Sequence, residues 1–189
     1  MRYLFILLLF PLGLFAQTKP IESALGVKFG ASKESVQAIV KARGGTPDLS
    51  DSKNPNTLNY KNLKVGGRLT YSVTFQFVNN KVYQILIFFT SEKDPLSIDL
   101  YNDIRNDLVS VYGESEETRN FKSPYEKGDG YEITALKGGY ATIEDLWLDP
   151  VNETGIKLSI NDILLIILRY QDGKLFEANR KNNNPLKDF

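Results

Sequence analysis

Residues 69–89 alternate apolar and polar side chains over two consecutive runs, and this alternation constrains the fold more than any other feature of the chain. In the first run every second residue is apolar: Leu69, Tyr71, Val73, Phe75 and Phe77. The second run has a matching set: Tyr83, Ile85, Ile87 and Phe89. Alternation with a period of two is typical of strands that bury one face and expose the other. The stretch therefore predicts a β-hairpin in an antiparallel sheet.

The loop of this hairpin decides which side chains lie opposite one another. A two-residue loop at Asn79 and Asn80 pairs Phe75 with Gln84, which puts an amide into the apolar face. A three-residue loop over 79–81 gives a consistent set of pairs: Phe77 with Tyr83, Phe75 with Ile85, Val73 with Ile87 and Tyr71 with Phe89. A slip of one residue moves every side chain to the other face, so we expect the three-residue loop. With Asn80 at positive φ in this loop, Asn80→Gly is expected to stabilise the protein by up to about 1 kcal/mol.

The first sixteen residues have the pattern of a secretory signal peptide. Arg2 precedes an apolar run over residues 3–15, and Ala16 supplies a small residue just before a polar stretch. The run is short for a membrane span and Pro11 interrupts it, so we expect cleavage after Ala16 rather than a retained anchor. The mature chain is expected to be exported to the periplasm or the medium, without stable membrane insertion.

Composition restricts the class of partner and the kind of cross-link. The sequence has 23 basic and 23 acidic residues, a balance that gives no reason to expect a nucleic-acid partner. It has no cysteine, so it forms no disulfide and carries no lipid on a cysteine at the cleavage site. The exported domain is therefore expected to depend on its hydrophobic core, with no cofactor.

Two segments have the signals of amphipathic helices. The first begins after Ser32, a favourable N-cap residue, with Glu34 in the first turn, and ends at Gly44-Gly45. The second is expected to begin at Asp94-Pro95 and to end at Gly113. Its apolar face comprises Leu100, Tyr101, Ile104, Leu108, Val111 and Tyr112. On the opposite side Asp99, Asp103 and Asp107 form a row that we interpret as a solvated face rather than a metal site.

Together these patterns predict an α+β fold, an antiparallel sheet with two main helices packed on one face. Strands are expected at 131–136 and 140–148, around Ile156 to Ile160, and at 163–170, while residues 114–130 are interpreted as a connection. The domain is expected over residues 17–175, as two pseudo-repeats of about 27–93 and 94–175, followed by a flexible tail over 176–189. The expected core includes Phe75, Phe77, Ile85, Ile87, Ile104, Leu108, Ile166 and Leu168.

The segment from Val27 to Val36, followed by a helix ending in glycine and strands joined by an Asn-Asn-Lys turn, resembles a known repeat. It is similar to the helix-then-sheet repeat of β-lactamase inhibitor protein-like domains and to the small lipoproteins that assist outer-membrane assembly. The matching positions, Gly30, Ser32 and Gly113, are capping and turn residues. The resemblance therefore implies a fold and carries over no functional residue.

The absence of histidine and cysteine excludes several kinds of catalytic site. It removes Ser-His-Asp and Cys-His arrangements and the imidazole and thiolate metal sites. A carboxylate pair, as in glycoside hydrolysis, or a Ser-Lys dyad remains possible. Glu144 and Asp145 point to opposite faces of one strand, although Glu132 could face one of them across a hairpin. Asp145 shares a face with Trp147, where burial is expected to raise its pKa.

We expect the chain to act as a non-catalytic binding or scaffolding module of the bacterial cell envelope, with an envelope protein or glycan as partner. The expected binding surface is the polar face of the sheet with an aromatic anchor at its rim: Thr70, Ser72, Thr74, Gln76, Gln84 and Trp147. A merely solvated face is the simpler interpretation of the same pattern. The alternatives are a glycan-directed hydrolase that uses two carboxylates, and a carrier that holds an apolar ligand between helices and sheet.

Overall fold

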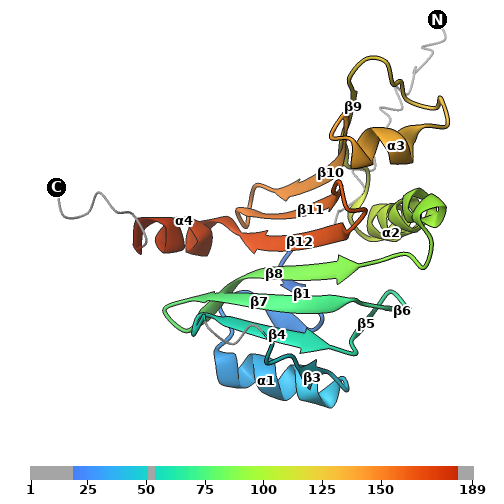
Figure 1. The fold of residues 1–189 in the computed structure, drawn as a ribbon. Helices are drawn as coiled ribbons and strands as arrows, with labels where there is room; N and C mark the ends of the chain where they lie inside the picture. The colour runs from blue at the N-terminus through green and yellow to red at the C-terminus, as the bar shows by residue number, and fades with distance from the viewer. Residues whose placement is uncertain (1–18, 51–53, 183–189) are drawn as a thin grey trace, which may run out of the picture.

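A computed structural model describes residues 19–50 and 54–182 (Figure 1). The predicted signal peptide and residues 183–189 of the predicted tail lie outside this part of the chain. The fold is α+β, as predicted. It is built on one large antiparallel sheet of eight strands, which are, in spatial order, β3 (Thr46–Pro47), β4 (Thr57–Lys61), β7 (Ser72–Val78), β8 (Lys81–Phe89), β12 (Ile166–Asp172), β11 (Thr154–Ile160), β10 (Ala141–Asp149) and β9 (Glu116–Phe121).

Each half of the described chain places one main helix before four strands of the large sheet. In the first half, helix α1 (Lys33–Ala42) precedes β3, β4, β7 and β8. In the second, a short 3₁₀ turn η1 (Asp94–Leu96) leads into α2 (Ser97–Tyr112), which precedes β9, β10, β11 and β12. Strands β8 and β12 pair at the centre and join the two halves into one sheet. Small hairpins, β1 (Ser23–Ala24) with β2 (Val27–Lys28) and β5 (Lys64–Val65) with β6 (Arg68–Leu69), flank the sheet.

The central hairpin has the predicted arms but a different loop. Phe75 pairs with Ile85 and Val73 with Ile87, as predicted, whereas Phe77 pairs with Val82. The predicted three-residue loop is wrong: Val78 pairs with Lys81, so the turn contains two residues, Asn79 and Asn80. Both lie at positive φ, 50° and 59°, as a type I′ turn requires.

An irregularity in the ladder reconciles the tight turn with an apolar face. The register shifts between Gln76 and Phe77, so Tyr83 is the extra residue on β8. Gln84 is thereby placed opposite Gln76 on the polar face instead of opposite Phe75. The first run also stops short of its prediction, because Leu69 and Tyr71 lie outside β7 and are more than 60% exposed.

Both predicted helices pack on one face of the sheet, which we call the helix face. The Lys33 ammonium of α1 lies 5.7 Å from the ring centre of Phe77, and the Tyr101 hydroxyl of α2 donates to Asp145 of β10. Ser32 caps α1 through the Ser35 amide, and Gly113 ends α2 at φ 83°. All eight predicted core residues are buried, each at most 7% exposed. Burial of such side chains contributes about 1.5–3 kcal/mol apiece, which explains why these alternating positions determine the fold.

The second half departs from the sequence prediction in three places. Residues predicted as a strand at 131–136 form helix α3 (Glu132–Lys137), which buries Ala135 and Leu136. The predicted connection contains the edge strand β9, which takes the place beside β10. The predicted strand at 163–170 begins only at Ile166, because residues 161–165 form a turn with Leu164 at φ 62°. A short apolar run in the sequence does not distinguish a helix from a strand, and contacts with other parts of the fold determine which of the two forms.

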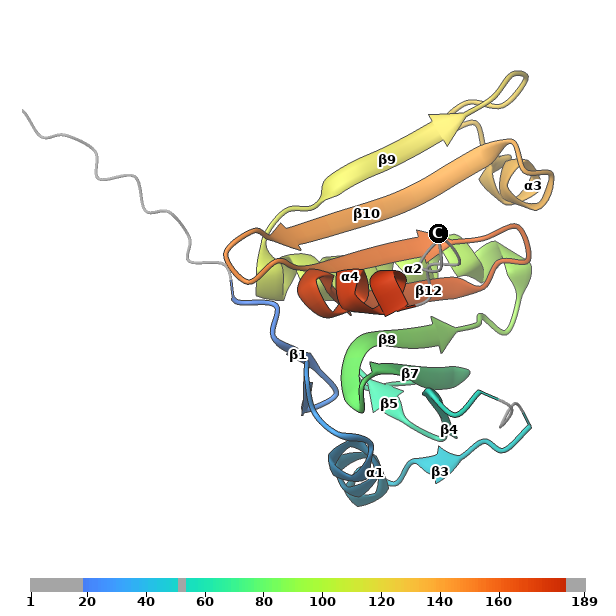
Figure 2. The ribbon, with the colours of Figure 1, turned by 90° about the vertical axis from the view of Figure 1, so that its left-hand side faces the viewer.

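The predicted flexible tail begins inside a helix. Helix α4 (Gly173–Asn182) follows β12 directly and packs on the sheet face opposite α2, as Figure 2 shows. The ring of Phe176 lies 6.2 Å from the ring of Tyr83, and Asn179 donates to the Tyr83 hydroxyl at 3.2 Å. The polar composition of this segment concealed the few side chains that attach it to the sheet.

Candidate binding site

Only part of the predicted binding surface lies on the sheet face opposite α1 and α2, which we call the open face. Trp147 is on the helix face, 4% exposed, and its indole N–H donates to the Gly113 carbonyl at 2.8 Å. Thr70 lies before β7, 5% exposed, and donates to the Leu63 carbonyl. Both residues are therefore buried in structural contacts and lie outside the open face, contrary to the sequence prediction.

The remaining predicted residues do share the open face, but three of them are already hydrogen-bonded to other side chains of the protein. Thr74 donates to Asn59 at 2.7 Å, and Gln76 accepts from the Tyr83 hydroxyl at 2.9 Å. Gln84 is 7% exposed and donates to Gln171 at 2.6 Å. Ser72 is half-buried at the start of β7. Helix α4 packs over β7, β8 and β12, so this half of the open face is already covered.

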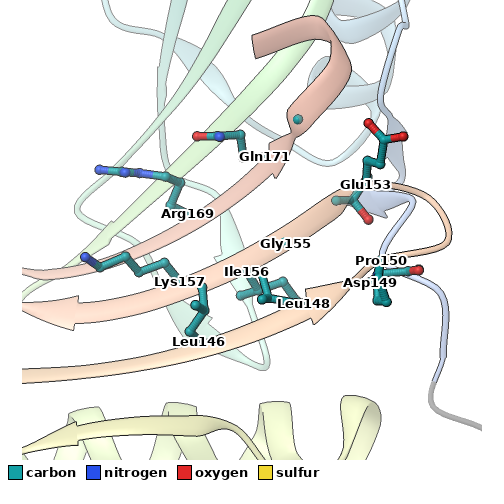
Figure 3. Close-up of a pocket in the computed structure, with 12 residues that line it drawn as sticks. Leu146, Leu148, Asp149, Pro150, Glu153, Gly155, Ile156, Lys157, Arg169 and Gln171 are labelled. Carbon is teal, nitrogen blue, oxygen red and sulfur yellow. The ribbon is translucent and has the colours of Figure 1, made fainter. Parts of the chain in front are cut away.

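The uncovered half of the open face contains a pocket of about 400 Å³ across β10, β11 and β12 (Figure 3). Leu146 and Leu148 of β10 form its apolar side, and Leu148 is 65% exposed. Lys157 of β11 and Arg169 of β12 extend toward one side, and Glu153 lies at the other. We call this cavity the open-face pocket. Its volume is in the range of small-molecule sites.

The strand register explains why a hollow forms at this place. Leu146, Lys157 and Arg169 are successive neighbours across the three strands, and Leu148, Gly155 and Gln171 form the next row. Gly155 contributes no side chain, which leaves a gap between Leu148 and Gln171. A Cβ atom there would lie 3.4 Å from a Leu148 methyl carbon and 3.2 Å from the Trp147 carbonyl oxygen. A larger side chain at this position would fill the pocket.

Four charged side chains line the open-face pocket, and three of them have partners. Asp149 accepts from the Ile21 amide and from Asn152, and Glu153 lies 3.4 Å from the Lys174 ammonium. The Lys157 ammonium lies 2.7 Å from a Glu144 oxygen. Arg169 is exposed, and within the described residues its guanidinium makes no hydrogen bond or ion pair. The pocket therefore presents one uncompensated positive charge.

The position of Arg169 is unfavourable for stability. It lies directly opposite Lys157, and like charges at opposed positions of a sheet are destabilising. Thr154, which also lines the pocket, has a buried hydroxyl oxygen without a hydrogen-bond partner among the described residues. Arg169 thus lies near the exposed Leu148 without a counter-charge from the described residues. An arrangement that costs stability in this way is characteristic of binding sites.

The residue expected to have the most perturbed pKa, Asp145, belongs to a buried ion-pair network under α2. Its side chain is fully buried and accepts from Tyr101 at 2.6 Å, Ser115 at 2.6 Å, Arg105 at 2.9 Å and Arg119 at 2.5 Å. Burial by itself raises the pKa of Asp145, but these four hydrogen bonds outweigh it and hold the pKa below its ordinary value. The expected upward shift is therefore wrong. Burial, with the hydrogen bond to Asp145, raises the pKa of Tyr101.

The carboxylates considered for hydrolysis do not form a pair. Glu144 points to the open face and binds Lys157, while Asp145 is saturated by donors on the helix face. Glu132 lies on α3, where its carboxylate accepts from the Gly128 amide. Within residues 19–50 and 54–182, no three acidic side chains come close enough together to hold a metal ion, and Asp99, Asp103 and Asp107 are exposed as expected.

No family model matches the chain, and no curated protein or solved structure matches it either. Among the helices of the described residues, none has the length and apolar content needed to cross a bilayer. Function is therefore inferred from the geometry of the open face. Sequence reasoning missed Leu146, Leu148 and Arg169. The available signal was the presence of Leu146, Leu148 and Arg169 at positions of β10 and β12 whose side chains alternate away from the buried face.

Proposed function

We propose that this protein is an exported, non-catalytic binding module of the cell envelope that binds its partner through the open-face pocket. Export is supported by the signal-peptide pattern of residues 1–16. Binding is supported by one observation above the others: the exposed Leu148 and the half-buried Leu146 lie beside an arginine for which the described residues provide no counter-charge. A concave apolar surface with a few convergent polar groups is the usual form of a ligand site.

The proposal also explains how the two faces of the sheet differ. The helix face is filled by a single hydrophobic core that includes side chains of α1, α2 and the long strands. Side chains on this face therefore stabilise the fold and are not available to a partner. On the open face, α4 packs against β7, β8 and β12, whereas the open-face pocket lies across β10, β11 and β12. A rigid sheet with one bare half positions side chains accurately without needing a conformational change.

Retention from envelope extract tests this proposal. Immobilised wild-type protein is compared with Leu148→Glu, and Ile163→Glu is the matched control, because Ile163 is 74% exposed in the turn before β12 and does not line the pocket. Proteins, glycans and lipids retained by each are identified by mass spectrometry. We expect a component that wild type and Ile163→Glu retain and Leu148→Glu loses. Identical sets from all three proteins would refute binding through this pocket.

A further inference from the structure

We propose that the ligand of the open-face pocket is a single-chain amphipathic anion, whose carboxylate binds Arg169 and whose hydrocarbon lies over Leu146 and Leu148. This inference rests on the proposed function and specifies the chemical class of the ligand. It follows from three features of the described residues: the unpaired positive charge of Arg169, the backbone hydrogen bonds already formed under the pocket, and the absence of a side chain at Gly155.

The charge determines the sign of the ligand. Asp149, Glu153 and Lys157 each have a partner, so the charge that a ligand would have to balance is that of Arg169. A planar guanidinium binds a carboxylate through two parallel hydrogen bonds, a geometry that a lysine cannot offer. Lys157, the cross-strand neighbour of Arg169, is paired with Glu144, so Arg169 is the cation at this end of the pocket that is left without a counter-charge among the described residues. A ligand carboxylate at Arg169 would supply the counter-charge that the described residues do not provide there.

The backbone under the pocket favours a hydrocarbon over a peptide. Strand β11 is paired with β10 and β12, β12 is also paired with β8, and β10 is also paired with β9. The N–H and C=O groups of these strands are therefore engaged in the ladders. A peptide lying across them would leave its own amide groups without partners, which is costly when water is excluded. A hydrocarbon chain has no such groups.

The gap at Gly155 gives the hydrocarbon a path. Gly155 is extended, without a positive φ, so its backbone conformation does not require glycine. Gly155 leaves a stretch of the pocket floor as bare backbone in the row next to Lys157 and Arg169, and a Leu148 methyl carbon borders this space, 3.4 Å from where a Cβ atom would be. A chain anchored at Arg169 can lie in this space against Leu146 and Leu148. The volume of about 400 Å³ accommodates one such chain.

The test is an NMR titration of the folded chain with three probes below their micelle concentrations. Decanoate supplies tail and anion, decyltrimethylammonium supplies the tail with a cation, and acetate supplies the anion alone. We expect only decanoate to shift the amides of residues 146–157 and 169–171. Arg169→Gln is expected to weaken decanoate binding about tenfold or more, whereas Arg180→Gln, the same charge change on exposed Arg180 of α4, leaves it unchanged.

A binding defect must be separated from a folding defect. Since Arg169 faces a like charge, Arg169→Gln is expected to unfold at an equal or higher urea midpoint than wild type. Equal binding of decyltrimethylammonium, equal affinities of the two arginine variants, or shifts seen only above the micelle concentration would overturn the ligand class. If decanoate fails while Leu148→Glu still loses an envelope component, the proposed function stands with a different ligand. If both experiments fail, both proposals are refuted.

Discussion

Asp145→Asn tests how the second helix is attached to the sheet. Asp145 is fully buried and accepts from side chains of α2, β9 and the segment between them, so it joins three parts of the second half. Removal of one partner from a buried ion pair costs about 3–5 kcal/mol, because the other charge is left without compensation. Arg105 keeps Glu117 at 2.5 Å, and asparagine can still accept hydrogen bonds, so we expect the lower end, about 3 kcal/mol.

Urea unfolding at neutral pH measures this loss. With a slope of about 2 kcal/mol/M, the midpoint is expected to fall by about 1.5 M. Asp103→Asn is the matched control, because Asp103 is exposed on the outer side of α2, and such surface changes stay within about 0.5 kcal/mol. If Asp145→Asn cost no more than this control, the network would not be what holds α2 on the sheet.

The same substitution predicts a change in acid stability. The folded pKa of Asp145 is lowered below its ordinary value of 3.8. Its contribution to stability is therefore fully present above about pH 4 and is lost as the pH falls through the lower folded pKa. Between pH 4 and pH 2 the wild type should lose more stability than Asp145→Asn. Parallel curves for the two proteins over this range would contradict the direction of the shift.

Four other substitutions test the local structure, each by urea unfolding monitored by far-ultraviolet circular dichroism. Asn79→Gly should stabilise the protein by up to about 1 kcal/mol, because glycine adopts a positive φ without strain. Asn80→Gly should stabilise it less, because the Asn80 side chain also accepts a hydrogen bond from the Lys33 amide at the start of α1. A larger stabilisation from Asn80→Gly than from Asn79→Gly would contradict this. Gly45→Ala should destabilise the protein by about 1–3 kcal/mol, since a Cβ atom would lie 2.5 Å from a Val40 methyl carbon. If the variant were as stable as the wild type, the side chains around Gly45 would have to move without cost. Trp147→Phe should cost about 1–3 kcal/mol by leaving the Gly113 carbonyl unpaired, and a neutral result would remove that hydrogen bond from the explanation.

The sequence predicted those features that depend on local periodicity. The second arm of the central hairpin, the first arm from Ser72 onward, both main helices and the eight core residues are as expected, because alternation and capping act over a few residues. The loop was mispredicted for an instructive reason. A regular ladder closed by a two-residue turn would place Gln84 on the apolar face, and the chain avoids this with an extra residue at Tyr83.

The features that were missed depend on contacts between distant residues. Gln84 is tolerated at 7% exposure because Gln171, 87 residues later, accepts its hydrogen bond. Helix α4 is attached by Phe176 and Asn179 to Tyr83 of β8, which its own composition does not reveal. The open-face pocket requires the register that puts Lys157 opposite Arg169 and Gly155 beside Leu148. No single segment of the sequence contains this information.

Site-specific photo-crosslinking in intact cells measures most directly whether the open-face pocket binds a component of the envelope. A photoreactive amino acid replaces Leu148 in one variant and Ile163 in the other, two exposed aliphatic positions that differ in whether they line the pocket. We expect a defined adduct from position 148 that is lost when Arg169→Gln is added, and none from position 163. The same adducts from both positions, or an adduct from position 148 that is indifferent to Arg169, would contradict the proposed site.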